Sequence, residues 1–193
     1  MKRIILASTS PRRRELMRQT GFPFEVMPAD YEEDMTLPLA PEELVMHLSR
    51  GKAMAVAHEH PDAIVIGGDS IVTQDGKVFG KPHTPERALE MLRELNGHTH
   101  RIVTGLTVID TGAKRSVSES SELVVYFNTL TEEQLSAYVD TGEPLDRAEA
   151  YAIQGIGRQL VARYEGDYEG AVGLSVDLLT PILKAFTTAE TRP

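Results

Sequence analysis

Strand-like and helix-like segments alternate along almost the whole chain of 193 residues. Short apolar runs such as 4–7 and 63–66 are typical of buried strands, and capped amphipathic stretches lie between them. This alternation predicts an α/β fold in which helices flank a central sheet. No linker, repeat or low-complexity tract divides the chain, so we expect a single domain over residues 1–193 with a frayed tail at 187–193.

Local signals place the expected elements. The expected strands are 4–7, 22–27, 63–66, 101–109 and 116–127, with a hairpin at 71–79 and two short strands between 157 and 175. The hairpin turns at Asp75-Gly76, a favoured two-residue turn pair. Helices are expected to begin at Pro11, Pro41, Pro85 and Thr131, and a closing helix is expected over 176–186. The spacing of Thr131 and Gln134 also predicts a capping box.

The start of the first helix carries an unusual concentration of positive charge. Ser10 is a good N-cap and Pro11 a good first helical residue, and Arg12, Arg13 and Arg14 follow directly. A helix start already carries about half a positive charge, so cations there are unfavourable by a few tenths of a kcal/mol each. Backbone N–H groups, the hydroxyls of Ser8 and Ser10 and the guanidinium groups would together hold a phosphate. The alternative is a solvated basic helix start.

Charge and composition limit the function classes. The chain has 20 Lys and Arg against 29 Asp and Glu, a net charge of -9, which disfavours binding to nucleic acid or an anionic membrane. A basic spot on an acidic protein suits a small anion better. The chain has no cysteine, which excludes thiol catalysis and cysteine-based zinc sites. The first apolar run is too short for a signal peptide or a membrane span, so we expect a cytoplasmic protein.

Asp69 is the strongest candidate for catalysis. It is predicted to follow the buried strand 63–66, between Gly68 and Ser70, at the kind of strand end where α/β sheets gather ligands. A carboxylate there would hold a metal or accept a proton from water. The alternative is a turn aspartate bonded to its own backbone.

Two lysines are weaker candidates for phosphate binding. Antiparallel pairing in the 71–79 hairpin would bring Lys81 back towards Asp69, although a solvated loop lysine explains it equally well. Lys52 lies in the second expected helix, where an ordinary surface lysine is the simpler interpretation.

Metal binding and base recognition have their own candidates. Glu33 belongs to an acidic cluster, and carboxylates from two loops suit a hard cation such as Mg²⁺ that also binds substrate phosphates; a solvated loop is the alternative. His98 and His100 alternate along a strand start and so share a face, but they lack a third ligand and a structural role is favoured. The amide of Gln154 both donates and accepts, as recognition of a base edge requires, or it orders its own loop.

Taken together these segments resemble the Maf family of nucleoside triphosphate pyrophosphatases. The matching segments are 8–13, Glu32-Glu33, Lys52-Ala53, 67–70, 80–82, Gly105, 143–146 and 151–155, and the resemblance reaches residue 174. The Arg12-Arg13 pair and the segment 152–155 resemble the branch that acts on dTTP and UTP. The sister branch prefers 7-methyl-GTP and typically has a glutamate where Gln154 stands.

The resemblance implies a central mixed sheet, two lobes around a cleft and often a homodimer. It also implies hydrolysis of a nucleoside triphosphate between the α and β phosphates with a divalent cation, Mg²⁺ or Mn²⁺. The roles that it implies are proton acceptor for Asp69, metal or water binding for Glu33, phosphate binding for Ser8, Arg13, Lys52 and Lys81, and substrate choice for Arg12, Ser70 and Gln154.

This chain departs from the family pattern at four positions. Ser70 replaces a threonine, Arg147 a lysine, Glu149 a glycine and Ser175 a proline. Glu149 bears most on efficiency and specificity, because a glycine there would serve a positive φ or a close approach, and a glutamate adds negative charge.

Three other functions compete with this interpretation. The same phosphate-binding groups would serve a pyrophosphatase for a modified purine nucleotide. A non-catalytic regulatory or nucleic-acid-binding protein, a role associated with septum inhibition in this family, is disfavoured by the acidic balance. A kinase-like transferase lacks a P-loop.

Overall fold

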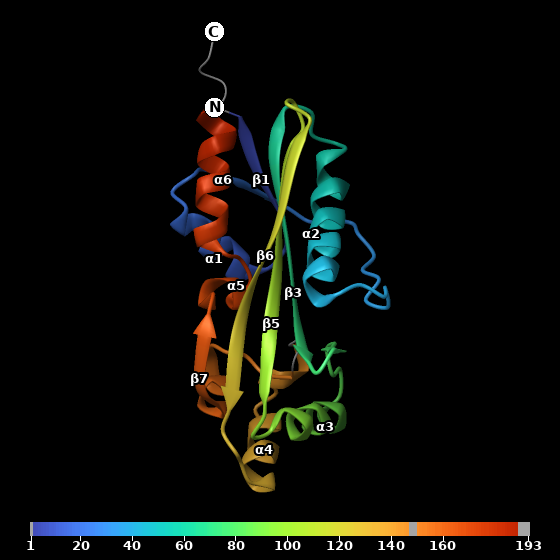
Figure 1. Ribbon diagram of the computed structural model, residues 1–193, viewed down its shortest axis with the longest axis vertical. Helices are drawn as coiled ribbons and strands as arrows, with labels where there is room; N and C mark the ends of the chain where they lie inside the picture. Colours follow the sequence, from blue (N-terminus) through green and yellow to red (C-terminus); the bar gives the residue numbers. More distant parts are fainter. Residues whose placement is uncertain (1, 147–149, 189–193) are drawn as a thin grey trace. The chain divides into compact units, whose positions relative to one another are not determined.

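The computed structural model describes residues 2–146 and 150–188 (Figure 1). Its strands are β1 (Arg3–Ala7), β2 (Glu25–Met27), β3 (Ala63–Gln74), β4 (Lys77–Phe79), β5 (Thr99–Asp110), β6 (Arg115–Phe127) and β7 (Val161–Gly166). Its α-helices are α1 (Pro11–Gln19), α2 (Pro41–Ala57), α3 (Pro85–Leu95), α4 (Glu132–Val139), α5 (Tyr168–Val172) and α6 (Val176–Thr188). Two 3₁₀ helices are η1 (Glu143–Asp146) and η2 (Gly155–Leu160). The predicted α/β fold with a mixed sheet is confirmed.

The strands form a seven-stranded mixed sheet in the order β2-β1-β3-β5-β6-β7, with β4 paired to β3. The pairs of β1 with β2 and β3 are parallel, whereas those of β3 with β4 and of β6 with β7 are antiparallel. Parallel neighbours need a crossover connection, and α1 and α2 supply them. The described chain divides into two compact units, 1–70 with 104–121 and 169–193, and 71–103 with 122–168.

Unit 1 has helices on both faces of its part of the sheet. Alternate residues of the strands, including Ile5 and Val65, pack against Ala53 and Val56 of α2 in a buried apolar cluster. Figure 1 shows α2 on one side of the strands and α1 and α6 on the other. This two-sided covering explains why the inner strands are nearly continuous apolar runs.

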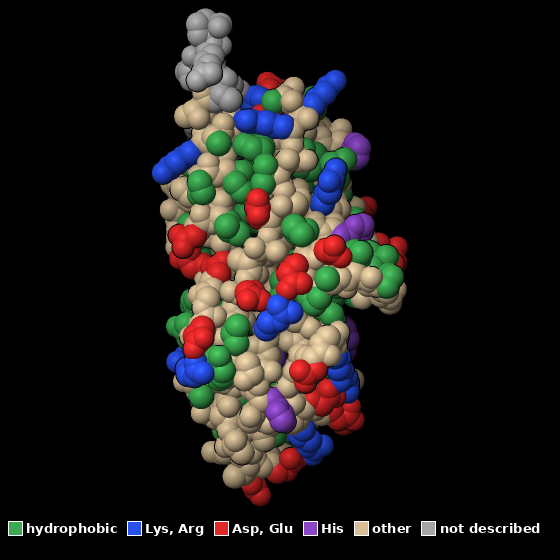
Figure 2. Space-filling view, viewed as in Figure 1, with side chains coloured by type: hydrophobic (Ala, Val, Ile, Leu, Met, Phe, Trp, Pro, Cys, Tyr) green, Lys and Arg blue, Asp and Glu red, His purple; other side chains and the backbone are tan. Residues whose placement is uncertain are grey.

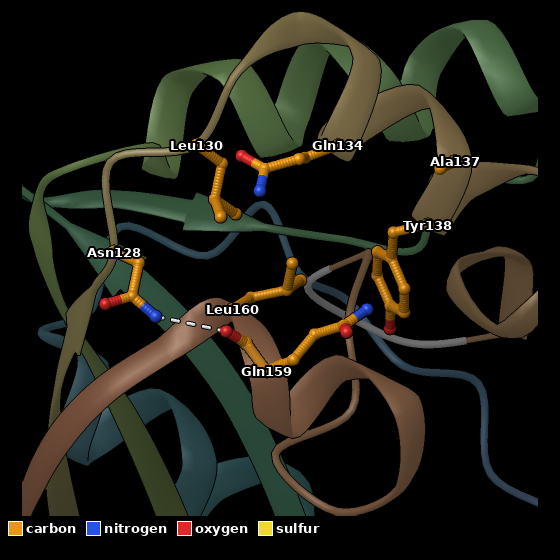
Figure 3. A pocket seen from close by; sticks show the side chains of 7 residues that line it. All are labelled: Asn128, Leu130, Gln134, Ala137, Tyr138, Gln159 and Leu160. Carbon is orange, nitrogen blue, oxygen red and sulfur yellow. Dashed lines mark hydrogen bonds between the residues drawn. The ribbon is translucent and has the colours of Figure 1, made fainter.

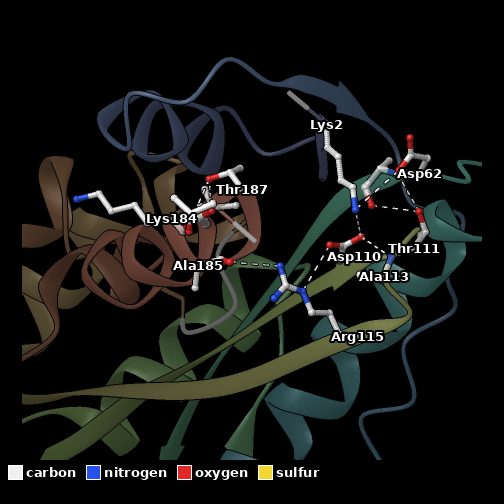
Figure 4. Close-up of polar contacts among 12 residues, drawn as sticks. Lys2, Asp62, Asp110, Thr111, Ala113, Arg115, Lys184, Ala185 and Thr187 are labelled. Carbon is white, nitrogen blue, oxygen red and sulfur yellow. Dashed lines mark hydrogen bonds and ion pairs between the residues drawn. The ribbon is translucent and has the colours of Figure 1, made fainter. Parts of the chain in front are cut away.

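A buried carboxylate joins the end of β5 to Lys2, the residue before β1, and to the start of β6. Asp110 is 1% exposed and accepts from Lys2 Nζ at 2.8 Å and from the N–H of Ala113 at 2.9 Å, and Arg115 Nε lies 3.5 Å away (Figure 4). Burial alone would raise the pKa of Asp110, but the hydrogen bonds and the two cations outweigh it and lower the pKa. The ionised carboxylate therefore connects these chain segments.

Unit 2 is built on the remaining lengths of β3, β5 and β6 together with β4, β7, α3 and α4. Asp75 and Gly76 both have positive φ, 50° and 81°, which is the predicted hairpin turn between β3 and β4. Thr131 and Gln134 form the predicted capping box of α4.

Two sequence-based expectations about elements were wrong. Only β7 stands where two strands were expected after residue 157, because α5 takes the place of the second. Helix α6 runs to Thr188, so Thr187 and Thr188 belong to it instead of a frayed tail; residues 189–193 lie outside the described residues. The departure at Ser175 is explained, because its Oγ accepts from the N–H of Leu178 at 3.4 Å at the start of α6.

Candidate active site

Asp69 lies inside a strand and not, as predicted, past the end of one. Strand β3 continues without a break through Gly67, Gly68 and Asp69 as far as Gln74. The glycines are there for close packing: a Cβ at Gly67 would lie 2.2 Å from the carbonyl oxygen of Ser49 in α2. The partner strand β1 pairs with β3 only as far as Ile66, so Asp69 still lies beyond the carboxyl end of β1.

Lys52 of α2 holds two carboxylates together. Its Nζ lies 2.5 Å from Asp69 Oδ1 and 2.8 Å from Glu33 Oε1. The side chains of Lys52 and Asp69 are 13% and 6% exposed, so the interpretation of Lys52 as an ordinary surface lysine is wrong. The ring of Tyr31 packs on Gly51 of α2, where a Cβ would lie 2.1 Å from Tyr31 Cζ. This packing places the loop that carries Glu33 against α2, beside Lys52.

The environment of Asp69 raises the pKa of its carboxyl. Burial raises the pKa of this carboxyl, the charges of Lys52 and Arg13 and the hydrogen bond from Lys52 lower it, and the charge of Glu33 raises it; the net shift is upward. Within the described residues Oδ1 is bound by Lys52 and no hydrogen bond reaches Oδ2. A carboxylate with a raised pKa and one available oxygen is a competent proton acceptor.

The two serines before α1 are arranged as the sequence predicts. Ser10 caps the helix, since its Oγ accepts from the N–H of Arg13 at 3.4 Å, and Ser8 Oγ accepts from the N–H of Ser10 at 3.1 Å. Each hydroxyl is used here as an acceptor, and no acceptor for its proton occurs among the described residues. Both O–H groups are therefore left to donate to an anion.

The arginines of the first turn of α1 differ in their surroundings. Arg13 Nε donates to the carbonyl oxygen of Gly173 at 2.9 Å, and Gly68 and Gly173 leave the space that its side chain occupies, because a Cβ at either would lie 3.3 Å from it. Burial lowers the pKa of Arg13, while the charges of Asp69 and Glu33 oppose that shift. Arg12 is exposed. The cation of the predicted phosphate site that is turned towards Asp69 is therefore Arg13.

Ser70, next to Asp69, belongs to a small hydroxyl cluster. Thr104 Oγ1 of β5 lies 3.0 Å from Ser70 Oγ and 2.8 Å from the carbonyl oxygen of Gly170 in α5. This cluster ties α5 to the strand segment that carries Asp69 and fixes the orientation of the Ser70 hydroxyl.

The carboxylates fit a divalent cation only in part. Glu33 and Asp69 converge on one point, where Lys52 Nζ lies. Within 2–146 and 150–188 no group of three or more His, Cys, Asp or Glu side chains could hold a metal ion. Two carboxylates match Mg²⁺, which takes one or two from the protein and completes its shell with water and substrate phosphates.

The other two predicted site residues, Lys81 and Gln154, belong to unit 2. Both are exposed. Lys81 follows the hairpin, whose pairing ends at Val72 with Phe79, and Gln154 precedes η2 without capping it through its side chain. Arg147 and Glu149, two of the four departures from the family pattern, lie outside the described residues.

The histidine pair is not a metal site. His98 is exposed, whereas His100 is 1% exposed and its Nε2 lies 2.8 Å from the hydroxyl of Tyr151. The rings of Phe127 and Tyr151 pack edge-on against His100 at 4.9 and 5.5 Å between ring centroids. Burial lowers its pKa to about 4. The favoured structural role is therefore confirmed for His100, and the expectation that the pair shares one face is wrong.

A hollow of about 470 Å³ in unit 2 contains none of the predicted site residues. Figure 3 shows Tyr138 reaching into it from α4, with Gln159 and Leu160 opposite. Its lining residues are Asn128, Leu130, Gln134, Ala137, Tyr138, Gln159 and Leu160. It offers amides and apolar groups without a cation, so it does not suit a polyphosphate.

Sequence reasoning missed several residues that position the site. The carbonyl of Gly173 that binds Arg13 is 160 positions away in sequence, and Thr104 and Gly170 gave no local signal. Glu143 was included only within the segment 143–146 that resembles the Maf family, and no role was predicted for it. On the face shown in Figure 2, acidic and basic side chains are interspersed. No helix in the described part of the chain is long and apolar enough to cross a membrane.

Comparison with solved structures supports the fold. The chain superposes on the Ham1 protein of Staphylococcus aureus with a TM-score of 0.52 at 13% identity, covering 95% of this chain and 99% of that one. The HAM1 protein of Coxiella burnetii gives a TM-score of 0.52 at 14% identity, covering 96% and 100%. At such identities the likeness extends to the fold alone.

Comparison of sequences identifies the family as well as the fold. The chain is 50% identical over 185 residues to the dTTP/UTP pyrophosphatase of Methanosarcina mazei, covering 95% of this chain and 94% of that one. It is 43% identical to the protein of the same name from Alkaliphilus oremlandii, covering 95% and 96%, and 44% identical to that from Bacillus cereus, covering 96% and 91%. The family model described as Maf-like protein matches residues 3–186, and this chain therefore belongs to the Maf family.

Proposed function

We propose that this chain is a nucleoside triphosphate pyrophosphatase that hydrolyses dTTP and UTP to the nucleoside monophosphate and pyrophosphate. Relatives at 43 to 50% identity over 95% of the chain carry that name. The observation that carries the proposal is the buried Asp69 carboxylate, with Oδ1 on Lys52 at 2.5 Å and Arg13 close enough to influence its pKa. One acid surrounded by cations is what breaking a phosphoanhydride with water requires.

In this proposal the triphosphate binds at the start of α1. Ser8 and Ser10 donate their hydroxyl protons to phosphate oxygens, and the terminal nitrogens of Arg13 neutralise charge there, since only its Nε is bound to Gly173. Lys52 lies between Asp69 and Glu33 and carries the ammonium group that a phosphate oxygen would share. These groups bring a polyanion to a buried carboxylate that would otherwise repel it.

Asp69 is the proton acceptor. A water molecule at Oδ2 attacks the α-phosphorus, its proton passes to the Asp69 carboxylate, and the bond from the α-phosphorus to the bridging oxygen breaks so that pyrophosphate leaves with the electron pair. The raised pKa of Asp69 makes its carboxylate a stronger base than an ordinary aspartate. A positioned base of this kind contributes about 10² to 10⁴-fold to the rate.

The proposal includes a divalent cation, Mg²⁺ or Mn²⁺. Glu33 and Asp69 are the residues that would hold it, because their oxygens already converge on one cationic atom. When bound, such an ion neutralises phosphate charge and makes a water molecule more acidic. Binding of such an ion would require Lys52 to give up its ion pair with Asp69, with Glu33 or with both.

Substrate choice in this proposal depends on Arg12, Ser70 and Gln154, and Lys81 adds a phosphate ligand. The support for these four roles is the family resemblance. The amide of Gln154 would pair its oxygen with the N3–H of uracil or thymine and its NH₂ with a carbonyl of the base. A homodimer and a cytoplasmic location also stay part of the proposal, and light scattering of the purified protein tests the former.

Purified protein assayed with dTTP, UTP and 7-methyl-GTP, with and without Mg²⁺ or Mn²⁺, tests the proposal. We expect monophosphate and pyrophosphate from dTTP and UTP, and a fall in turnover of at least about 10²-fold in Asp69→Asn, which removes the proton acceptor. Asp140→Asn, at an exposed aspartate after α4, is the matched control. Preference for 7-methyl-GTP would assign the chain to the sister branch, and a folded Asp69→Asn protein with normal turnover would contradict the role of Asp69.

A further inference from the structure

The carboxylate of Glu143 accepts hydrogen bonds from the backbone of the segment that carries Gln154. Its Oε1 accepts from the N–H of Ile156 at 3.2 Å and its Oε2 from the N–H of Gly157 at 2.8 Å. The same Oε2 accepts from the hydroxyl of Tyr138 at 2.8 Å. One carboxylate thus binds two successive amides of η2 and joins them to α4, and charge-assisted bonds of this kind are the stronger class.

Tyr138 holds the same segment on the other side of Gln154. Its hydroxyl accepts from the N–H of Ala152 at 3.2 Å, and the side chain is 1% exposed. Glu143 and Tyr138 therefore fix the backbone two residues before Gln154 and two and three residues after it. The fit is tight, because a Cβ at Gly155, where φ is +85°, would lie 2.5 Å from Glu143 Oε1.

The side chain of Gln154 itself is left unbound. Gln154 is exposed, it makes no cap to η2, and no hydrogen bond of its side chain occurs within the described residues. The backbone of Gln154 is held in place, and the donors and the acceptor of its side-chain amide are unused. The amide is therefore pre-organised to form hydrogen bonds with a ligand. The fixed backbone matters because an amide must present its oxygen and nitrogen to a base edge within a few tenths of an ångström.

We infer that Glu143 is a positioning residue for base selection, which acts by holding the Gln154 segment through two backbone amides and Tyr138. The inference rests on the proposed function, since it names the residue that makes discrimination by Gln154 effective. Glu143 itself makes no contact with substrate. Glu143 therefore controls which base is accepted, whereas the phosphate chemistry belongs to Asp69 and the residues around it.

The test compares UTP with CTP, which differ at the edge that the Gln154 amide would read. In Glu143→Ala the ratio of kcat/KM for UTP to that for CTP should fall by at least about 10-fold, through KM, while kcat for UTP changes by less than about 3-fold. Hydrogen exchange at the amides of Ile156 and Gly157 should accelerate. Glu119→Ala, at an exposed glutamate of β6, is the matched control and should alter neither.

The outcomes separate this inference from the function on which it rests. Wild-type protein without activity on UTP or dTTP would overturn both. An active wild type whose Glu143→Ala variant keeps its UTP preference, or loses activity on both nucleotides equally, would overturn the inference alone. If Glu143→Ala does not fold, Tyr138→Phe provides the test, because it keeps the buried ring and removes the hydroxyl that binds both Glu143 and Ala152. The same loss of preference is expected there, and its absence would overturn the inference.

Discussion

Burial of His100 should make the protein sensitive to mild acid. The ring packs against Phe127 and Tyr151, its Nε2 lies 2.8 Å from the Tyr151 hydroxyl, and its Nδ1 is buried without a hydrogen-bond partner in the described residues. Burial lowers the pKa from 6.5 to about 4. The folded protein therefore keeps His100 neutral where the unfolded chain takes up a proton.

The sign and size of the effect follow from linkage. His100 contributes its full stability above the unfolded pKa of 6.5, and this contribution is lost as pH falls from there towards about 4. A shift of that size corresponds to about 3 kcal/mol in total, at 1.36 kcal/mol for each pKa unit. Between pH 8 and pH 5 the loss attributable to His100 should be about 2 kcal/mol, or about 30-fold in the unfolding equilibrium.

Urea unfolding at pH 8 and pH 5 measures this difference in wild type and in His100→Gln. The variant should be less stable than wild type at pH 8, because it loses ring packing. The difference in free energy of unfolding between the two proteins should be smaller by about 2 kcal/mol at pH 5. His98→Gln, at an exposed histidine, should follow the wild-type pH dependence. An NMR titration of the wild-type imidazole gives an independent check. A His100 ring that titrates near 6.5, or a gap that stays constant with pH, would refute the reasoning.

Three further predictions concern other charged or polar side chains. Lys52→Met should move the acid limb of the kcat/KM profile to higher pH, because Lys52 lowers the pKa of Asp69; an unmoved limb would show that this pair does not set the pKa. Asp110→Asn should lower the free energy of unfolding at pH 7 by about 1–3 kcal/mol, since it weakens the bond from Lys2, and urea unfolding would detect a change of that size. Gln154→Glu should lower kcat/KM for UTP and dTTP by about 5 to 150-fold and affect 7-methyl-GTP less or raise it, whereas an equal loss on all three would remove Gln154 from base recognition.

Local sequence determined most of the elements of this protein. Ser10 with Pro11 begins α1, Thr131 with Gln134 caps α4, and Asp75-Gly76 turns the hairpin, because each signal acts within about four residues of chain. The same local arguments selected Asp69 as the candidate acid and the serines before α1 as phosphate ligands. Family resemblance supplied the reaction, which no local pattern contains.

Tertiary structure alone decided how the candidate residues are used. The pairing of Lys52 with Asp69 depends on α2 packing over Gly67, and Arg13 is oriented by the carbonyl of Gly173, 160 positions away. The expected end of the strand before Asp69 was wrong for the same reason: Gly67 is required inside β3 by the close approach of α2, a contact that no local pattern contains. Charge pairing and burial are set by contacts between distant segments, so a pattern read along the chain identifies the candidates but not their partners or their pKa shifts.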